Sequence, residues 1–207
     1  MSVSRLYYVH DPMCSWCWGF APVLKQLLIS LPDNIEVKRL LGGLAVDTDE
    51  PMPAGMQTML QDTWRRIEKK IPGTKFNFDF WSQCQPRRST YPSCRAVIAA
   101  RQQGQQFDEL MTAAIQKAYY QQARNPSDTD TLIALAGELG LDENSFKQDL
   151  LSEQTQQQLE REIESSRELH AESFPSLVLQ IGSSTWPVLV DYNDPVPMLE
   201  SIKLLTK

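Results

Sequence analysis

Residues 10–20 read HDPMCSWCWGF and place two cysteines, Cys14 and Cys17, three positions apart. The short apolar run at residues 6–9 predicts a buried strand in front of this stretch. The apolar residues that follow at 23, 24, 27, 28 and 31 have the spacing of one helix face. A Cys-x-x-Cys pair between a strand and a helix is typical of a redox-active dithiol. The stretch therefore predicts where the fold begins and which chemistry to look for.

The helix expected over residues 14–30 places Cys14 in its first turn. There the unpaired backbone N–H groups and the positive end of the helix dipole favour a thiolate. Cys17 follows one turn later on the same side and is expected to be more buried. Cys14 is therefore predicted to exchange with the substrate, and Cys17 to resolve the mixed disulfide. Ser15, which lies between them, is the candidate for tuning the pair.

Other uses of the cysteines fit the sequence less well. A zinc site would need further ligands with suitable spacing. Cys84 and Cys94 are separated by nine residues, and His10 and His170 are the only histidines. A purely structural bridge from Cys14 to Cys17 would close almost no chain. We expect Cys84 and Cys94 to be two idle thiols rather than a second disulfide, and we expect no metal.

The bulk composition excludes several classes of protein. The 207 residues are 42% hydrophobic and 22% charged, with a formal net charge of −6, which gives no basic surplus for nucleic acid or anionic membranes. No apolar run approaches the about 20 residues that span a bilayer. Residues 1–5 are too few and too polar for a signal peptide, and four cysteines are too few for a secreted disulfide scaffold. We therefore expect a cytoplasmic protein with neither nucleic acid nor membrane as a partner.

In the rest of the chain, the spacing of the apolar residues distinguishes expected strands from expected helices. Strands are expected at 5–9, 35–41, 177–181 and 186–190, and a closing helix at 197–205. Between them, residues 56–70 and most of 92–171 have helical spacing, and Ser127 with Asp130 predicts a capping box. The order is β-α-β, then helices, then β-β-α, and the first two strands should be parallel. We expect one domain from residues 1–45 and 172–207, interrupted by a helical insertion domain at 46–171.

Apolar side chains surround the dithiol. Trp18 and Phe20 are expected in the core, whereas Met13 and Trp16 are candidates for a hydrophobic surface that accepts unfolded or peptide segments. His10 and Asp11, just upstream, are interpreted as turn residues.

With these residues in place, the chain resembles the DsbA-like branch of the thioredoxin superfamily. Within it, the chain is most similar to the cytoplasmic FrnE-type group, which is related to the 2-hydroxychromene-2-carboxylate isomerases and the kappa-class glutathione transferases. The residues that carry the resemblance are 11–19 (DPMCSWCWG), Pro22, 42–44 (GGL) and 173–176 (SFPS). The similarity spans essentially the whole chain.

The resemblance implies a thioredoxin fold interrupted by a helical domain that covers the dithiol. It implies that Cys14 is the nucleophile, that Cys17 resolves, and that Pro175 is cis and lies against them, with Phe174 beside the substrate. Unlike the secreted DsbA proteins, this chain is not expected to carry a signal peptide. The isomerase and transferase relatives typically have a lone serine at the position of Cys14 and bind glutathione.

We therefore expect a thiol-disulfide oxidoreductase or isomerase that acts on protein or peptide thiols and disulfides. Its redox group would be the Cys14–Cys17 disulfide, with no other cofactor, although glutathione remains a possible ligand. One alternative is a glutathione-dependent isomerase or transferase acting on a small aromatic molecule. Another is an adaptor that holds partners through its helical part without turnover. The sequence carries no signal of a particular oligomeric state.

Overall fold

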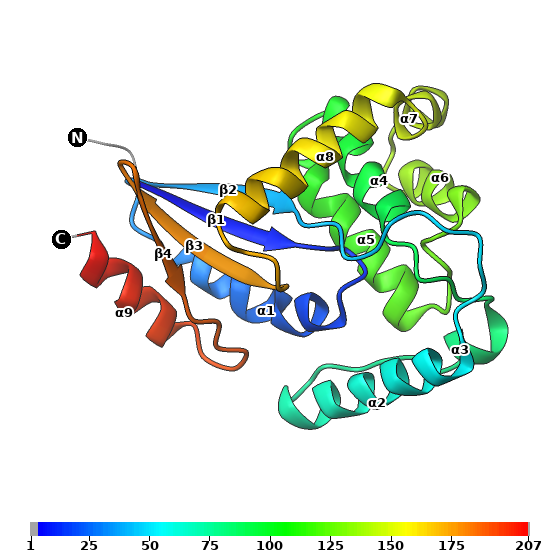
Figure 1. Ribbon diagram of the computed structural model, residues 1–207, viewed down its shortest axis with the longest axis horizontal. Coiled ribbons are helices and arrows are strands. Elements are labelled where there is room, and N and C mark those ends of the chain that lie inside the picture. Colours follow the sequence, from blue (N-terminus) through cyan, green and yellow to red (C-terminus); the bar gives the residue numbers. More distant parts are fainter. Residues whose placement is uncertain (1–3, 207) are drawn as a thin grey trace.

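The computed structural model describes residues 4–206, and within that range the strands form one sheet in the order β2-β1-β3-β4 (Figure 1). The strands are β1 (Ser4–His10), β2 (Ile35–Leu41), β3 (Ser176–Ile181) and β4 (Ser184–Val188). β1 and β2 are parallel, whereas β3 is antiparallel to both β1 and β4. The expected β-α-β and β-β-α halves are therefore confirmed, and they meet where β1 pairs with β3.

The two faces of the sheet pack against different elements. On one face, α1 (Ser15–Ile29) and α9 (Val196–Leu205) cover alternate residues such as Leu6, Tyr8 and Leu179. On the other face, Val9 and Val178 pack with the segment that links α8 to β3, around Leu169 and Ala171. Successive side chains of a strand point to opposite faces of the sheet, so each strand contributes residues to the packing on both faces.

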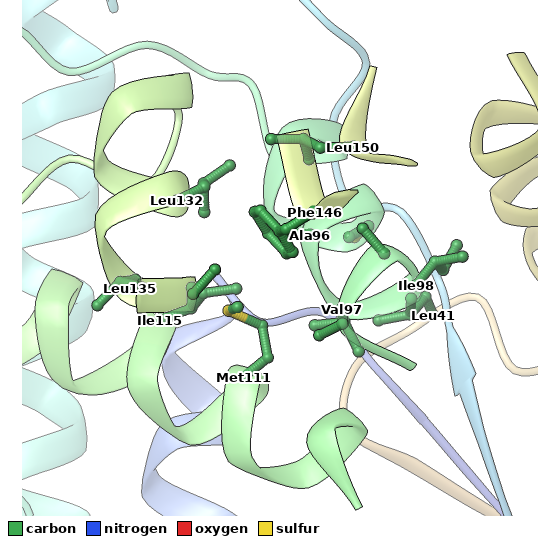
Figure 2. Packing of buried hydrophobic residues seen from close by; sticks show 14 of the residues in the cluster. Leu41, Ala96, Val97, Ile98, Met111, Ile115, Leu132, Leu135, Phe146 and Leu150 are labelled. Carbon is green, nitrogen blue, oxygen red and sulfur yellow. The ribbon is translucent and has the colours of Figure 1, made fainter. Parts of the chain in front are cut away.

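The long middle part of the chain is helical, as expected. Its helices are α2 (Ala54–Lys70), α3 (Phe80–Gln83), α4 (Tyr91–Gln102), α5 (Phe107–Gln121), α6 (Thr129–Glu138), α7 (Glu143–Leu150) and α8 (Glu153–Glu168). Figure 2 shows the apolar core they share, in which Leu41 of β2 packs beside Val97 and Ile98 of α4. A second, aromatic cluster surrounds Trp64 of α2 and includes Phe76, Phe80 and Tyr120. The helical part therefore shares both cores with the rest of the chain, since Leu41 of β2 enters the first and Met13, just before α1, enters the second.

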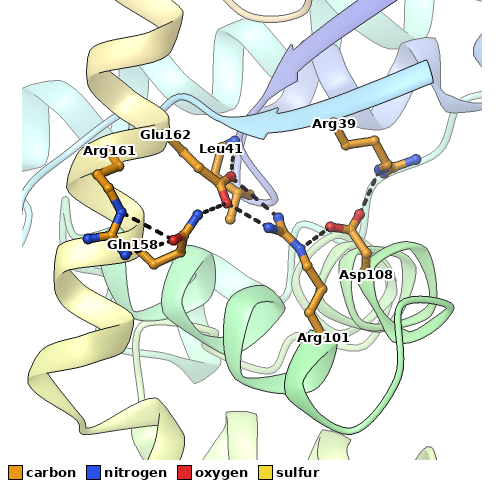
Figure 3. A network of polar contacts seen from close by, with 7 residues as sticks. All are labelled: Arg39, Leu41, Arg101, Asp108, Gln158, Arg161 and Glu162. Carbon is orange, nitrogen blue, oxygen red and sulfur yellow. Dashed lines mark hydrogen bonds and ion pairs between the residues drawn. The ribbon is translucent and has the colours of Figure 1, made fainter. Parts of the chain in front are cut away.

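A charged network ties the helices to the free edge of β2 (Figure 3). Glu162 of α8 accepts a hydrogen bond from the backbone N–H of Leu41 at 2.9 Å and pairs with Arg101 of α4 at 2.6 Å. Asp108 of α5 pairs with Arg101 and, at 2.7 Å, with Arg39 of β2. We call Arg39, Arg101, Asp108 and Glu162 the seam. It covers a strand edge that would otherwise leave backbone groups unpaired.

Two local expectations are wrong. The N-cap of α6 is Asp128 rather than Ser127, because the buried hydroxyl of Ser127 donates to the carbonyl oxygen of Ser89 at 2.7 Å. The last strand covers 184–188 instead of 186–190, because Ser184 pairs with Ile181 directly after a two-residue turn at Gly182, whose φ is +60°. Leu189, expected in the strand, is 88% exposed.

Candidate active site

Cys14 lies at the junction of β1 and α1, as the N-cap residue of that helix. Its backbone is extended, its N–H donates to the carbonyl oxygen of Asp11 at 3.0 Å, and its carbonyl accepts the first helical hydrogen bond from Trp18. Cys14 therefore stands at the N-terminus of α1, where the sequence placed it, but its sulfur makes no capping hydrogen bond to the N–H groups of the first turn. The residue is only 6% exposed.

The segment before β3 meets Cys14 from the other end of the chain. The peptide bond between Phe174 and Pro175 is cis, and the thiol of Cys14 donates to the carbonyl oxygen of Phe174 at 3.4 Å. The expectation that Cys14 and Pro175 lie together is confirmed. Antiparallel pairing of β1 with β3 explains the approach, because it aligns the end of β1 with the start of β3.

Cys17 lies one turn further along α1 and is completely buried. Burial raises the pKa of its thiol well above the ordinary value, and the neighbouring Cys14 sulfur raises it further. Tyr8 of β1 lies beneath it, and the pKa of this phenol is also raised, first by burial and then by Cys17. The pair is thus asymmetric, with one thiol near the surface and the other inside.

Asp11 is not the simple turn residue that the sequence suggested. Its side chain is fully buried, and its oxygens accept hydrogen bonds from the N–H groups of Met13 (2.8 Å) and Leu44 (2.7 Å). They also accept from Thr90 (2.7 Å) and Cys94 (3.5 Å) at the start of α4. Burial raises the pKa of Asp11, while these hydrogen bonds lower it. Asp11 therefore joins the dithiol loop to two segments that are distant in the sequence.

His10 is also buried, as the last residue of β1, so its interpretation as a turn residue is wrong. Its ring stacks on that of Tyr8, with centroids 4.7 Å apart. Burial lowers its pKa well below the ordinary value, and the cations Arg39 and Arg101 lower it further. His10 is thus a neutral core residue at neutral pH.

Gly42 and Gly43 follow β2, and the ring of Phe174 lies against Gly42. A Cβ atom on Gly42 would overlap the ring of Phe174, and one on Gly43 would overlap Ile163 and Tyr91. Gly43 also has a φ of +62°, which a side chain would strain. Two glycines after β2 hinted at a turn, but no sequence signal pointed to the contact of Gly42 with Phe174.

The burial of the apolar residues around the dithiol differs from the expectation. Met13 is 8% exposed and packs beneath the site, so it offers almost no surface to a substrate, whereas Trp16 is half-buried at the rim. Trp18 is half-buried too and not fully in the core, unlike Phe20. Ser15 and Phe174 are also half-buried, and their roles stay predictions.

Two residues at the rim had no sequence signal. The ring of Tyr192, in the loop after β4, lies 5.1 Å from that of Trp16, and the ammonium of Lys70 at the end of α2 lies over both rings. Burial raises the pKa of Tyr192 to about 12, with Cys17 and Cys14 adding to the shift. Three distant segments therefore meet beside the dithiol.

The remaining thiols lie apart and unbridged. Cys94 contacts Asp11, whereas the thiol of Cys84 donates to the carbonyl oxygen of Ala123. In the described part of the chain, no group of three or more His, Cys, Asp or Glu side chains could hold a metal ion. Among the helices between residues 4 and 206, none is both long and apolar enough to cross a membrane.

Comparison with known proteins agrees with this geometry. The family model described as Thioredoxin matches residues 7–185. The ClpXP adapter protein SpxH of Halalkalibacterium halodurans is 28% identical over 178 residues, which are 84% of this chain and 58% of that protein. SpxH of Bacillus subtilis is 24% identical over 174 residues, which are 84% of this chain and 57% of that protein. The chain thus spans less than three fifths of these relatives.

Solved structures of similar length superpose over nearly the whole chain. A candidate protein disulfide isomerase from Nitrosomonas europaea has a TM-score of 0.84 at 25% identity, covering 98% of this chain and 97% of that one. The cytosolic disulfide reductase DsbM of Pseudomonas aeruginosa has a TM-score of 0.77 at 22% identity, covering 98% of both chains. Together with the family model and the dithiol geometry, this places the chain in the thioredoxin family, with the fold of the DsbA-like oxidoreductases.

Proposed function

We propose that the chain is a thiol-disulfide oxidoreductase or isomerase that exchanges disulfides with protein or peptide substrates through Cys14 and Cys17. The observation that carries the proposal is the thiol of Cys14 against the carbonyl of Phe174, beside cis-Pro175, with Cys17 buried one turn behind. Such an arrangement gives one sulfur access to a substrate and keeps the other for the second step.

The exchange proceeds in two displacements. The Cys14 thiolate attacks one sulfur of a substrate disulfide, so that bond breaks, a mixed disulfide forms and one substrate thiolate leaves. Cys17 then loses its proton and attacks the sulfur of Cys14, which forms the Cys14–Cys17 disulfide and releases the second substrate thiolate. Two electrons pass from the dithiol to the substrate, and the reverse sequence oxidises a substrate dithiol.

The neighbouring residues take supporting roles in this proposal. Pro175 shapes the chain beside Cys14, Trp16 and Phe174 contact the substrate, and Ser15 tunes the thiols. Met13, which is buried, supports the loop from below instead of contacting the substrate. We place the protein in the cytoplasm, which accords with the description of the fold neighbour DsbM as cytosolic.

The decisive test compares the unmodified protein with Cys14→Ser and Cys17→Ser in insulin reduction and in refolding of scrambled ribonuclease. Cys14→Ser should abolish both activities, because no sulfur remains to form the mixed disulfide. Cys17→Ser should instead trap mixed disulfides with the substrate, visible by non-reducing gel electrophoresis. Unchanged activity of Cys14→Ser would refute the proposal.

Two other functions have one supporting observation each. Non-enzymatic adaptor function is favoured by the relatives described as ClpXP adapter proteins. It predicts that a protein partner binds equally well to the unmodified protein and to the Cys14→Ser variant.

A glutathione-dependent isomerase or transferase is favoured by the fold neighbour DsbM, which has also been solved with GSH. That function predicts saturable glutathione binding and an activity that survives Cys17→Ser.

A further inference from the structure

Positive charge is concentrated at one end of α2 and in the turn that follows. Residues 65–75 hold five of the 20 Lys and Arg residues but only one of the 26 Asp and Glu residues, in a chain of net charge −6. All five cations are exposed, and we call them the basic strip: Arg65, Arg66, Lys69, Lys70 and Lys75. The single acid, Glu68, accepts a hydrogen bond from the backbone of Phe76.

The cations of the basic strip lie on the exposed part of α2 and in the turn after it, and Lys70 is close enough to Asp191 to help lower the pKa of that carboxylate. Arg65 and Lys69 are four positions apart on the helix, as are Arg66 and Lys70, so each pair lies on one side. Arg65 pairs with Asp62 at 2.8 Å. Within residues 4–206, the other four make no ion pair with a carboxylate.

The basic strip ends at the dithiol. The ammonium of Lys70 lies 5.4 Å from the ring centroid of Trp16, which stands between the two cysteines in the sequence. On the other side of the turn, the carbonyl oxygen of Lys75 accepts a hydrogen bond from the indole N–H of Trp18 at 3.3 Å. A chain segment bound along α2 would therefore arrive beside Cys14.

We propose that the basic strip is the docking surface for an acidic segment of a protein substrate, which brings the disulfide of that substrate to Cys14. The proposal rests on the proposed oxidoreductase function for the reaction, but not for the binding. A short acidic segment would contact only the strip. A long polyanion such as nucleic acid would extend onto the rest of the chain, where all but one of the 26 acidic residues lie.

Binding is tested with two dye-labelled peptides that share an apolar centre and lack cysteine, one flanked by glutamates and one by lysines. Fluorescence anisotropy should show the acidic peptide binding at least about tenfold more tightly at low salt. The preference should collapse as salt rises from about 0.01 M to about 1 M, because the screening length falls from about 30 Å to about 3 Å.

A matched pair of variants assigns the effect to the strip. R66E/K69E should remove the preference, because it reverses two of the five charges of the strip. Within residues 4–206, neither side chain makes an ion pair or a contact with the dithiol. K147E/K203E changes the net charge equally at exposed positions on α7 and α9 and should keep the preference. Equal binding of the two peptides, or equal effects of the two variants, overturns the proposal. Tighter binding of a DNA duplex or a phosphatidylserine vesicle that R66E/K69E abolishes also overturns it.

Turnover separates this proposal from the proposed function. The same two peptides, rebuilt with an internal disulfide, are compared with uncharged hydroxyethyl disulfide, and dithiothreitol is supplied as the reductant that regenerates the Cys14–Cys17 dithiol after each turnover. R66E/K69E should lower the ratio of kcat/KM for the acidic over the lysine peptide at least about fivefold. If the unmodified protein reduces none of the three, the oxidoreductase function fails while the anisotropy result still decides the docking surface.

Discussion

Two buried polar regions lie at the dithiol and at the seam, and they hold their carboxylates in opposite ways. At the dithiol, the hydrogen-bond donors to Asp11 in the described part of the chain are all neutral: two backbone N–H groups, a hydroxyl and a thiol. At the seam, Asp108 and Glu162 face the guanidinium groups of Arg39 and Arg101.

The difference shows which region can change its charge. Without a cation beside it, burial raises the pKa of Asp11 above its ordinary value. At the seam, burial lowers the pKa of Arg101, but Glu162 and Asp108 outweigh it and the net shift is upward. The seam is therefore a fixed ionic connection between the helices and β2, whereas the dithiol region is held by neutral contacts and can take up a proton.

Removing one charge from the seam should give the largest loss of stability. Glu162→Ala leaves Arg101 with a single carboxylate partner and leaves the N–H of Leu41 without an acceptor, so we expect a loss of about 3–5 kcal/mol in urea unfolding. The control is Glu164→Ala on the same helix, whose ion pair with Arg167 is exposed. It should cost less than about 1 kcal/mol. Equal losses would show that the seam is not a fixed connection.

Local patterns were enough to predict the strands, most helices and the dithiol, because each depends on residues within one short segment. The contacts that complete the site do not. Asp11 looked like a turn residue because its partners Leu44, Thr90 and Cys94 lie 33, 79 and 83 positions away. Nothing in the sequence of α2 indicated that Lys70 would lie over Trp16. Pro175 was found only because a family resemblance marked its position.

The neutral contacts of the dithiol region should be broken by a single methyl group. In Gly42→Ala the new Cβ overlaps the ring of Phe174, so the ring and the carbonyl that faces Cys14 must move. We expect a loss of about 2 kcal/mol in unfolding free energy and a larger proportional loss of insulin reduction. Both are measured on the same preparation.

Two further variants test whether overlap with the ring of Phe174 causes the loss of stability in Gly42→Ala. Adding Phe174→Ala to Gly42→Ala should recover stability, because the overlapping ring is gone. Gly55→Ala, in the first turn of α2 with nothing within 4 Å, should be neutral or stabilising by up to about 1 kcal/mol. If the double variant is no more stable than Gly42→Ala, the contact with Phe174 is not the reason for the glycine.

Asp11→Asn tests the dithiol region with the smallest expected change in stability, about 1 kcal/mol at neutral pH. The amide keeps one acceptor oxygen and loses the other, but it also removes a buried charge that no cation neutralises. The informative quantity is therefore the pH dependence. Because folding raises the pKa of Asp11 above 3.8, the folded state binds its proton more readily than the unfolded state. The stability that Asp11 contributes is present at low pH and declines as pH rises from about 3.8 to the raised value.

Urea unfolding of the unmodified protein and of Asp11→Asn between about pH 2 and pH 8 should thus show the unmodified protein losing its advantage as pH rises above about 3.8. Asp191→Asn supplies the opposite sign. The exposed carboxylate of Asp191 accepts from the N–H groups of Asn193 and Asp194, which lower its pKa. Its contribution is present above 3.8 and declines as pH falls. Slopes of the same sign for the two variants would mean that Asp11 is neutralised by a positive group, and that the dithiol region resembles the seam after all.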